Sequence, residues 1–192
     1  IHSNKLTSLP DLSKNVLLTE LNVNGNLLDS MPNLSKLVLL QKLYVHSNKI
    51  KKLAGVEKLV SLTDFWCYSN QLGNFPVLDK LTNMQWFDAS KNQLTVAPDF
   101  GKNSNIQIID IDYNNISSLP DNYSTYKNLK KMVLFQNKLT FKELTKIIPI
   151  TANDTVLQIL PQQTLSIGKP LLLTEGQAFS FSTGIDTSLA NI

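Results

Sequence analysis

Cysteine, long apolar runs and an excess of one charge are all missing from this chain. Cys67 is the single cysteine among 192 residues, so no disulfide can form within the chain. No stretch approaches the roughly 20 apolar residues that a membrane-spanning helix needs, so we expect no membrane insertion in this segment. The 18 basic and 15 acidic residues are mixed, without a basic block, which argues against nucleic-acid binding.

What the chain does have is asparagine at a nearly fixed interval of 22 residues, in a recurring frame. Around Asn48, apolar residues stand eight, five and three positions earlier and two positions later: Leu40, Leu43, Val45 and Ile50. Such a period is the signature of a repeat architecture. The asparagines that we expect to be structural are Asn26, Asn48, Asn70, Asn92, Asn114 and Asn137, with Asn4 carrying only the second half of the frame.

The spacing predicts the local structure of each repeat. The apolar pair two residues apart (Leu43 and Val45) has strand periodicity, so both side chains point to one face. The asparagine follows where the chain turns, and its amide can satisfy buried backbone groups of neighbouring coils. Proline follows the last apolar position of five coils and marks the chain leaving the sheet: Pro10, Pro32, Pro76, Pro98 and Pro120.

This frame resembles the leucine-rich repeat, Leu-x-x-Leu-x-Leu-x-x-Asn-x-Leu, over residues 1–139, and its length resembles the internalin-like bacterial class. The resemblance implies an α/β repeat fold: a right-handed solenoid with a parallel concave sheet and a 3₁₀ or extended convex side. Cys67 occupies an apolar frame position and is expected to be a core residue. Because the first repeat is incomplete, we expect a cap or further repeats, and an export signal, before Ile1.

The repeat pattern ends after Leu139, and residues 140–165 are predicted to form a C-terminal cap. Thr140 and Glu143 read as a capping box for a short helix ended by Pro149, with a strand over 155–160. Residues 166–192 are predicted either to begin an immunoglobulin-like β-sandwich or to add capping strands. The run Pro161-Gln162-Gln163 is similar to the exit from the repeats of bacterial surface proteins.

Strand residues between the apolar positions are predicted to face the concave side, where binding is expected. Adjacent strands lie about 4.8 Å apart, so Tyr44 should neighbour Trp66, and His46 should neighbour Tyr68. Exposed aromatic residues on a rigid sheet favour a binding surface, although strands also favour aromatic residues for their own stability. The predicted ligand-binding residues are Tyr44, His46, Asp64, Trp66, Tyr68, Trp86, Asp88, Asp110, Asp112, Tyr113 and Phe135.

Other chemistries fit this face less well. Asp88 and Asp110, one rung apart, would suit calcium only with further aligned carboxylates and a glycine-bearing loop, which are missing, so no metal or cofactor is expected. As a glycosidase pair they would stand on an open sheet without a cleft. His46 has serines near it, Ser47 and Ser69, but nothing that orients them as nucleophiles.

The sequence therefore predicts a non-enzymatic module that recognises a protein through its concave sheet. The absence of disulfide caps favours a bacterial origin, and the resemblance implies a place at the cell surface or outside the cell. Carbohydrate binding is an alternative, since tryptophan and tyrosine rings can stack on sugars. An intracellular scaffold without a dedicated ligand is a third.

Overall fold

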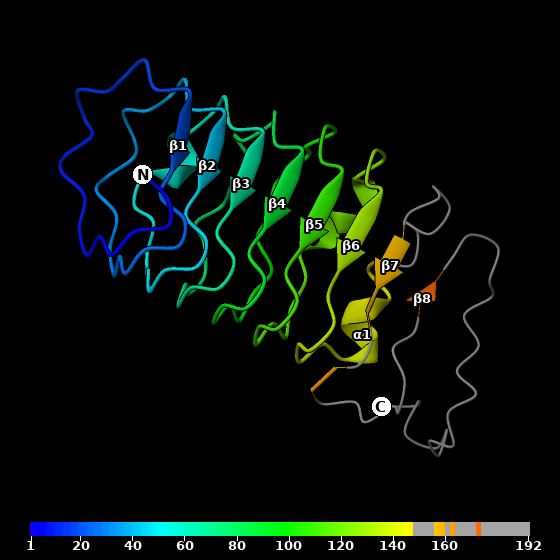
Figure 1. The fold of residues 1–192 in the computed structure, drawn as a ribbon. Helices are drawn as coiled ribbons and strands as arrows, with labels where there is room; N and C mark the ends of the chain where they lie inside the picture. The colour runs from blue at the N-terminus through cyan, green and yellow to red at the C-terminus, as the bar shows by residue number, and fades with distance from the viewer. Residues whose placement is uncertain (148–155, 160–161, 164–171, 174–192) are drawn as a thin grey trace, which may run out of the picture.

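The computed structural model describes residues 1–147, 156–159, 162–163 and 172–173, and it is a solenoid of stacked coils (Figure 1). Each coil contributes one short strand to a single sheet, in chain order from β1 to β8. The first seven strands run parallel, and β8 pairs antiparallel with β7. The strands are β1 (Glu20–Asn22), β2 (Lys42–Tyr44), β3 (Asp64–Trp66), β4 (Trp86–Asp88), β5 (Ile108–Asp110), β6 (Lys131–Val133), β7 (Val156–Gln158) and β8 (Leu172–Leu173).

The side opposite the sheet is built from tight turns, as the resemblance to leucine-rich repeats implied. The backbone N–H of Leu37 donates to the carbonyl of Leu34, and that of Leu40 to Leu37, both at 2.9 Å. In two coils the turns extend into 3₁₀ helices, η1 (Val56–Lys58) and η2 (Asp121–Thr125). No helix in the described part of the chain is long and apolar enough to cross a membrane.

The core lies inside the coils and consists of the frame residues. Leu43, Val45, Phe65 and Cys67 are all fully buried. Burial raises the pKa of the Cys67 thiol well above its usual value, so this cysteine is an inert core residue, as predicted. Because the side chains of a strand alternate between faces, burying these positions turns the residues between them toward the concave side.

The asparagine ladder joins each coil to the one before it. The Asn114 side-chain amide donates to the carbonyls of Ile111 and Asp112 in its own coil and of Ala89 in the preceding coil, at 3.0–3.1 Å. Its oxygen accepts from the backbone N–H of Leu94 at 3.0 Å. The equivalent four contacts are made by Asn26, Asn48, Asn70, Asn92 and Asn137.

A glutamine extends this ladder by one rung beyond the predicted repeats. Gln162, only 3% exposed, accepts from the backbone N–H of Leu139 at 3.2 Å and donates to the carbonyl of Leu134 at 2.9 Å. It also donates to the carbonyl of Ile159 in its own coil. The coil that carries β7 is therefore continuous with the repeats, although it lacks the asparagine by which the repeats were recognised.

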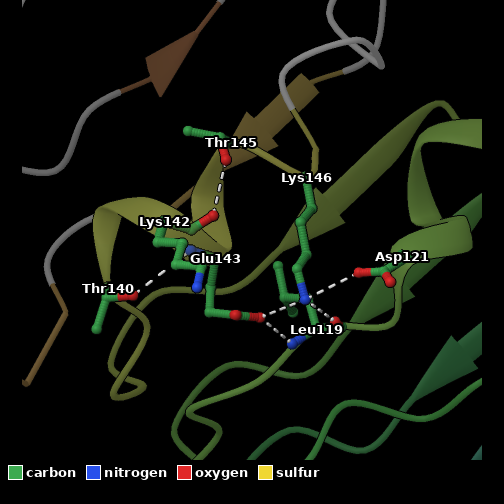
Figure 2. A network of polar contacts seen from close by, with 7 residues as sticks. All are labelled: Leu119, Asp121, Thr140, Lys142, Glu143, Thr145 and Lys146. Carbon is green, nitrogen blue, oxygen red and sulfur yellow. Dashed lines mark hydrogen bonds and ion pairs between the residues drawn. The ribbon is translucent and has the colours of Figure 1, made fainter.

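The predicted cap helix is present as α1 (Phe141–Leu144), but its capping contacts differ from a capping box (Figure 2). Thr140 caps the helix, accepting from the backbone N–H of Glu143 at 3.4 Å. The Glu143 carboxylate does not close the box; it accepts from the N–H of Leu119 in the preceding coil at 2.7 Å. Lys146 joins them, binding Glu143 at 3.1 Å, Asp121 at 3.0 Å and the Leu119 carbonyl at 2.9 Å.

β7 (Val156–Gln158) lies within the strand predicted over 155–160. Pro149, predicted to end the helix, lies outside the described residues. So does most of 166–192, apart from the two residues of β8, and its assignment to a further sandwich stays a prediction.

Candidate binding face on the concave sheet

The strand register aligns the concave-face residues in ladders across the coils, as the repeat frame predicted. The last residues of the strands pair in the order Asn22, Tyr44, Trp66, Asp88, Asp110 and Val133. The first residues of the strands pair in the order Glu20, Lys42, Asp64, Trp86, Ile108 and Lys131. Residues that are about 22 positions apart in sequence thus become lateral neighbours on one surface.

Five residues on the first coils form one contiguous group, which we call the aromatic cluster: Tyr44, His46, Trp66, Tyr68 and Trp86. The Trp66 ring lies at its centre, 4.7 Å from the Tyr44 ring, 5.2 Å from Trp86 and 6.4 Å from His46. Trp86 is 41% exposed, although it contacts Trp66. The indole N–H of Trp66 is buried without a hydrogen-bond partner.

His46 is held as a neutral ring at the edge of this cluster. It stacks on Tyr68 with ring centres 4.2 Å apart and planes 10° apart. The amide nitrogen of Asn24 lies 2.8 Å from Nε2, which assigns Nε2 as the acceptor and places the proton on Nδ1, facing the Ser47 hydroxyl at 3.2 Å. Burial lowers the pKa of His46, an effect that Asp88 partly offsets. In this tautomer the ring donates to Ser47 and does not activate it as a nucleophile.

Three carboxyl groups on the coils of β4 and β5 form a second group, the acidic cluster: Asp88, Asp110 and Asp112. Burial, followed by the charges of Asp112 and Asp88, raises the pKa of Asp110 to about 7. Burial and Asp88 raise the pKa of Asp112 to about 6, and burial raises that of Asp88. Removing a carboxylate from water and placing it beside another both disfavour its charged form, so the cluster holds its full negative charge only above neutral pH.

The remaining predicted site residues lie to either side of these clusters. Tyr113 and Phe135 contact edge to face at 5.2 Å, and the Lys91 ammonium lies 5.8 Å from the Tyr113 ring centre. Asp64 stands beside the aromatic cluster, where it accepts from the Thr63 hydroxyl at 2.7 Å. The predicted set therefore divides into an aromatic cluster, an acidic cluster and a second aromatic pair.

Two concave-face positions are more buried than strand alternation predicts. Asp112 is 8% exposed and Val133 is 1% exposed. Phe135 occupies the equivalent position one coil along from Asp112, and Tyr113 follows Asp112 in sequence. Alternation fixes the face on which a side chain lies, but the size of its neighbours decides how much solvent reaches it.

The residue before each asparagine adopts a left-handed backbone conformation, which sequence analysis missed. Its φ lies between 47° and 60° in all seven coils, and only one of these residues is a glycine: Ser3, Gly25, Ser47, Ser69, Lys91, Tyr113 and Gln136. Glycine is the usual signal of this conformation, and here it is nearly absent from the column. These side chains border the concave face at the point where each strand turns away.

Comparisons with known proteins identify the same architecture. No protein-family model matches the chain, and no curated protein matches it. Among solved structures, the leucine-rich repeat protein LIC12759 of Leptospira interrogans is 27% identical, with a TM-score of 0.69 over 83% of this chain. Internalin C2 of Listeria monocytogenes is 24% identical over 84%, with a TM-score of 0.67. YopM of Yersinia enterocolitica is 24% identical over 84%, with a TM-score of 0.63.

These structures are mostly longer than the chain. It spans 43% of the Leptospira protein, 69% of internalin C2 and 37% of YopM. The similarity therefore concerns the repeat array.

Proposed function

Because this chain is a leucine-rich-repeat solenoid with internalin-like repeats, we propose that it is a non-enzymatic recognition module that binds a protein through its concave sheet. The aromatic cluster is the observation that carries the proposal. Tyr44, Trp66 and Trp86 form a continuous run of rings on an open surface, and Trp86 is 41% exposed. Tryptophan and tyrosine are the residue types that dominate binding energy at protein interfaces.

The arrangement of polar groups also supports binding over catalysis. The neutral His46 ring donates toward Ser47, and the acidic cluster lies on an open sheet. A nucleophile needs a base that can take its proton, and paired carboxylates in glycosidases flank the bond that they cleave.

We further propose that the module belongs to a bacterial protein that is secreted or displayed on the cell surface. The three similar structures described above come from bacteria, and the repeat length is of the internalin-like class. Protease treatment of intact cells that express the natural protein tests this location. Loss of the protein from intact cells supports surface display, whereas protection until lysis supports the intracellular scaffold.

Ligand retention by single-residue variants tests the binding face. Trp86→Ala removes an exposed ring without opening the core, so it should weaken protein binding at least about 30-fold, the scale of an interface hot spot. Leu39→Ala is the matched control, because Leu39 is 45% exposed and lies outside the sheet. Equal retention by Trp86→Ala and wild type would contradict the proposal.

Carbohydrate binding is the second candidate, favoured by the exposed Trp86 ring standing beside the Asp64 and Asp88 carboxylates. Sugars stack on such rings and donate hydroxyl hydrogen bonds to carboxylates. A glycan array that binds wild type and loses Trp86→Ala, with no protein ligand captured, would replace the first proposal by this one.

A further inference from the structure

Among the residues that the structure describes, the acidic cluster has no basic side chain in contact with it, although clustered carboxylates in proteins are normally paired with positive groups. Asp88 of β4 and Asp110 of β5 are direct cross-strand partners, and Asp112 follows two residues after Asp110. Within the described part of the chain, the only ion pairs are those that Lys146 makes at the C-terminal cap. Three carboxyl groups therefore share one surface without a basic side chain in direct contact.

An independent sign of a missing partner is an unsatisfied oxygen in Asp112. Its Oδ1 is buried and accepts no hydrogen bond, in a residue that is 8% exposed. Asp88 differs, because its Oδ1 accepts from the Ser90 N–H at 3.0 Å and hydroxyl at 2.7 Å. Asp110 accepts, over a longer 3.4 Å, from the N–H of Asp112. Buried acceptors without partners are rare in folded proteins, since each carries its full desolvation cost.

The charged groups around the cluster act on it only from a distance. From β6, Lys131 lowers the pKa of all three carboxyl groups, and Lys91 lowers that of Asp112. His46, from the coil of β2, interacts with Asp88, but burial lowers the pKa of the His46 ring and keeps it neutral. The nearby Tyr68 and Cys67 groups are uncharged, because burial raises the pKa of each.

A metal ion is a poor candidate for the positive charge that would balance these carboxylates. No group of three or more histidine, cysteine, aspartate or glutamate residues among those described is arranged to hold one. A flat organic cation has weaker geometric demands, and the guanidinium of arginine offers five N–H donors in a plane. It also stacks on aromatic faces, and the exposed Tyr113 ring follows Asp112 directly.

We propose that the acidic cluster, Asp88, Asp110 and Asp112, receives an arginine side chain that the protein ligand presents to the concave face. This inference rests on the proposed protein-binding function and names the chemistry of the ligand. The aromatic cluster, which adjoins Asp88 through Trp66 and Trp86, would contact apolar residues of the ligand on one side of that arginine. The Tyr113–Phe135 pair would lie on the other side of the arginine.

Proton release should accompany this binding. A guanidinium among the carboxylates stabilises their charged forms, so it lowers their pKa values and expels the protons that they hold near neutral pH. Arginine binding is therefore expected to strengthen as the pH rises from about 5 to about 8, through the pKa values of about 6 and about 7 of Asp112 and Asp110.

The experiment is a carboxyl ¹³C NMR titration of the whole chain with N-acetylarginine amide, a probe with one positive charge. At saturation the probe should move the titration midpoints of Asp110 and Asp112 down by about one pH unit. N-acetylcitrulline amide, which is nearly isosteric but uncharged, should move neither midpoint. An equal shift with citrulline, no shift with arginine, or a stronger effect of calcium chloride than of arginine would each overturn the proposal.

Matched variants locate the effect. Asp110→Asn and Asp112→Asn keep the side-chain shape and should abolish the arginine-induced shift at the remaining carboxyl. Glu20→Gln, an exposed carboxylate on β1 of the same face but outside the predicted binding residues, should leave the shift unchanged. Because the probe needs no natural ligand, the result is separable from the proposed function. The two proposals can therefore fail separately. If arginine shifts the midpoints but Trp86→Ala still retains the ligand, the arginine site is supported and the aromatic binding face is contradicted.

Discussion

At the scale of single residues, the ladder asparagines are the most demanding positions in the chain. Each one satisfies three carbonyls and one N–H, drawn from two adjacent coils, as Asn114 shows. A short amide carries both donors and an acceptor. An apolar residue of similar size would fill the same space and leave these backbone groups without partners.

Asn114→Ala is therefore expected to lower the free energy of unfolding by roughly 3 kcal/mol, because several buried backbone groups lose their partners. Asn83→Ala is the control, since Asn83 is exposed and makes one bond, to the Val60 carbonyl at 2.9 Å. Its cost should stay below about 1 kcal/mol. Urea unfolding measures both. Equal losses in the free energy of unfolding would contradict the claim that the ladder asparagines stabilise the fold more than an exposed asparagine does.

The acidic cluster predicts an unusual dependence of stability on pH. The pKa of Asp110 is about 7 when folded, against 3.8 for an ordinary aspartate. A raised folded pKa means that this group's stabilising contribution is complete below about pH 4 and is lost as the pH rises through about 7. Asp110→Asn removes the titration, so its free energy of unfolding should exceed that of wild type at pH 8.

We expect that gain to be about 2 kcal/mol, a value reduced for the partial solvent exposure of the group. Between pH 4 and pH 5 the two proteins should differ much less. Urea unfolding at both ends of this range measures the difference. A constant gap between variant and wild type would contradict the assignment of the raised pKa to Asp110.

At the scale of elements, the repeat frame predicted the features that recur with the period and missed contacts that occur only once. The inward positions, the strands and the pairing of Tyr44 with Trp66 follow from a 22-residue spacing and alternation. Gln162 was missed because it differs from asparagine and lies outside the fixed interval. The bond from Glu143 to Leu119 was missed because a capping box is a local pattern, whereas this contact crosses to another coil.

The cap contact gives a prediction at this scale. Glu143→Ala leaves the part-buried N–H of Leu119 without its acceptor, which should cost about 1–2 kcal/mol in the free energy of unfolding. Glu143→Gln keeps an oxygen for that N–H and should cost less. Amide hydrogen exchange at Leu119 should accelerate in the alanine variant and remain slow in the glutamine variant. Equal exchange in the two variants would mean that charge, and not the acceptor, holds the cap.

At the scale of the whole molecule, stacking turns scattered residues into one surface. Repeats contact their neighbours in sequence, so the coils form an extended array whose concave side carries the strand residues in rows. Figure 1 shows these strands side by side along the solenoid. The rows could be predicted from sequence, but the burial of Asp112 and Val133 could not, since the repeat frame fixes only the face on which each side chain lies.

The central claim is that this concave face is where a partner binds. Oxidative footprinting of the purified complex measures it most directly, because tryptophan and tyrosine side chains are readily oxidised when solvent reaches them. On binding, the account predicts protection of Trp86, Trp66 and Tyr113, and unchanged labelling of Leu17 and Leu39, which are exposed outside the sheet. Protection of Leu17 and Leu39, with the two tryptophans labelled as in the free protein, would contradict it.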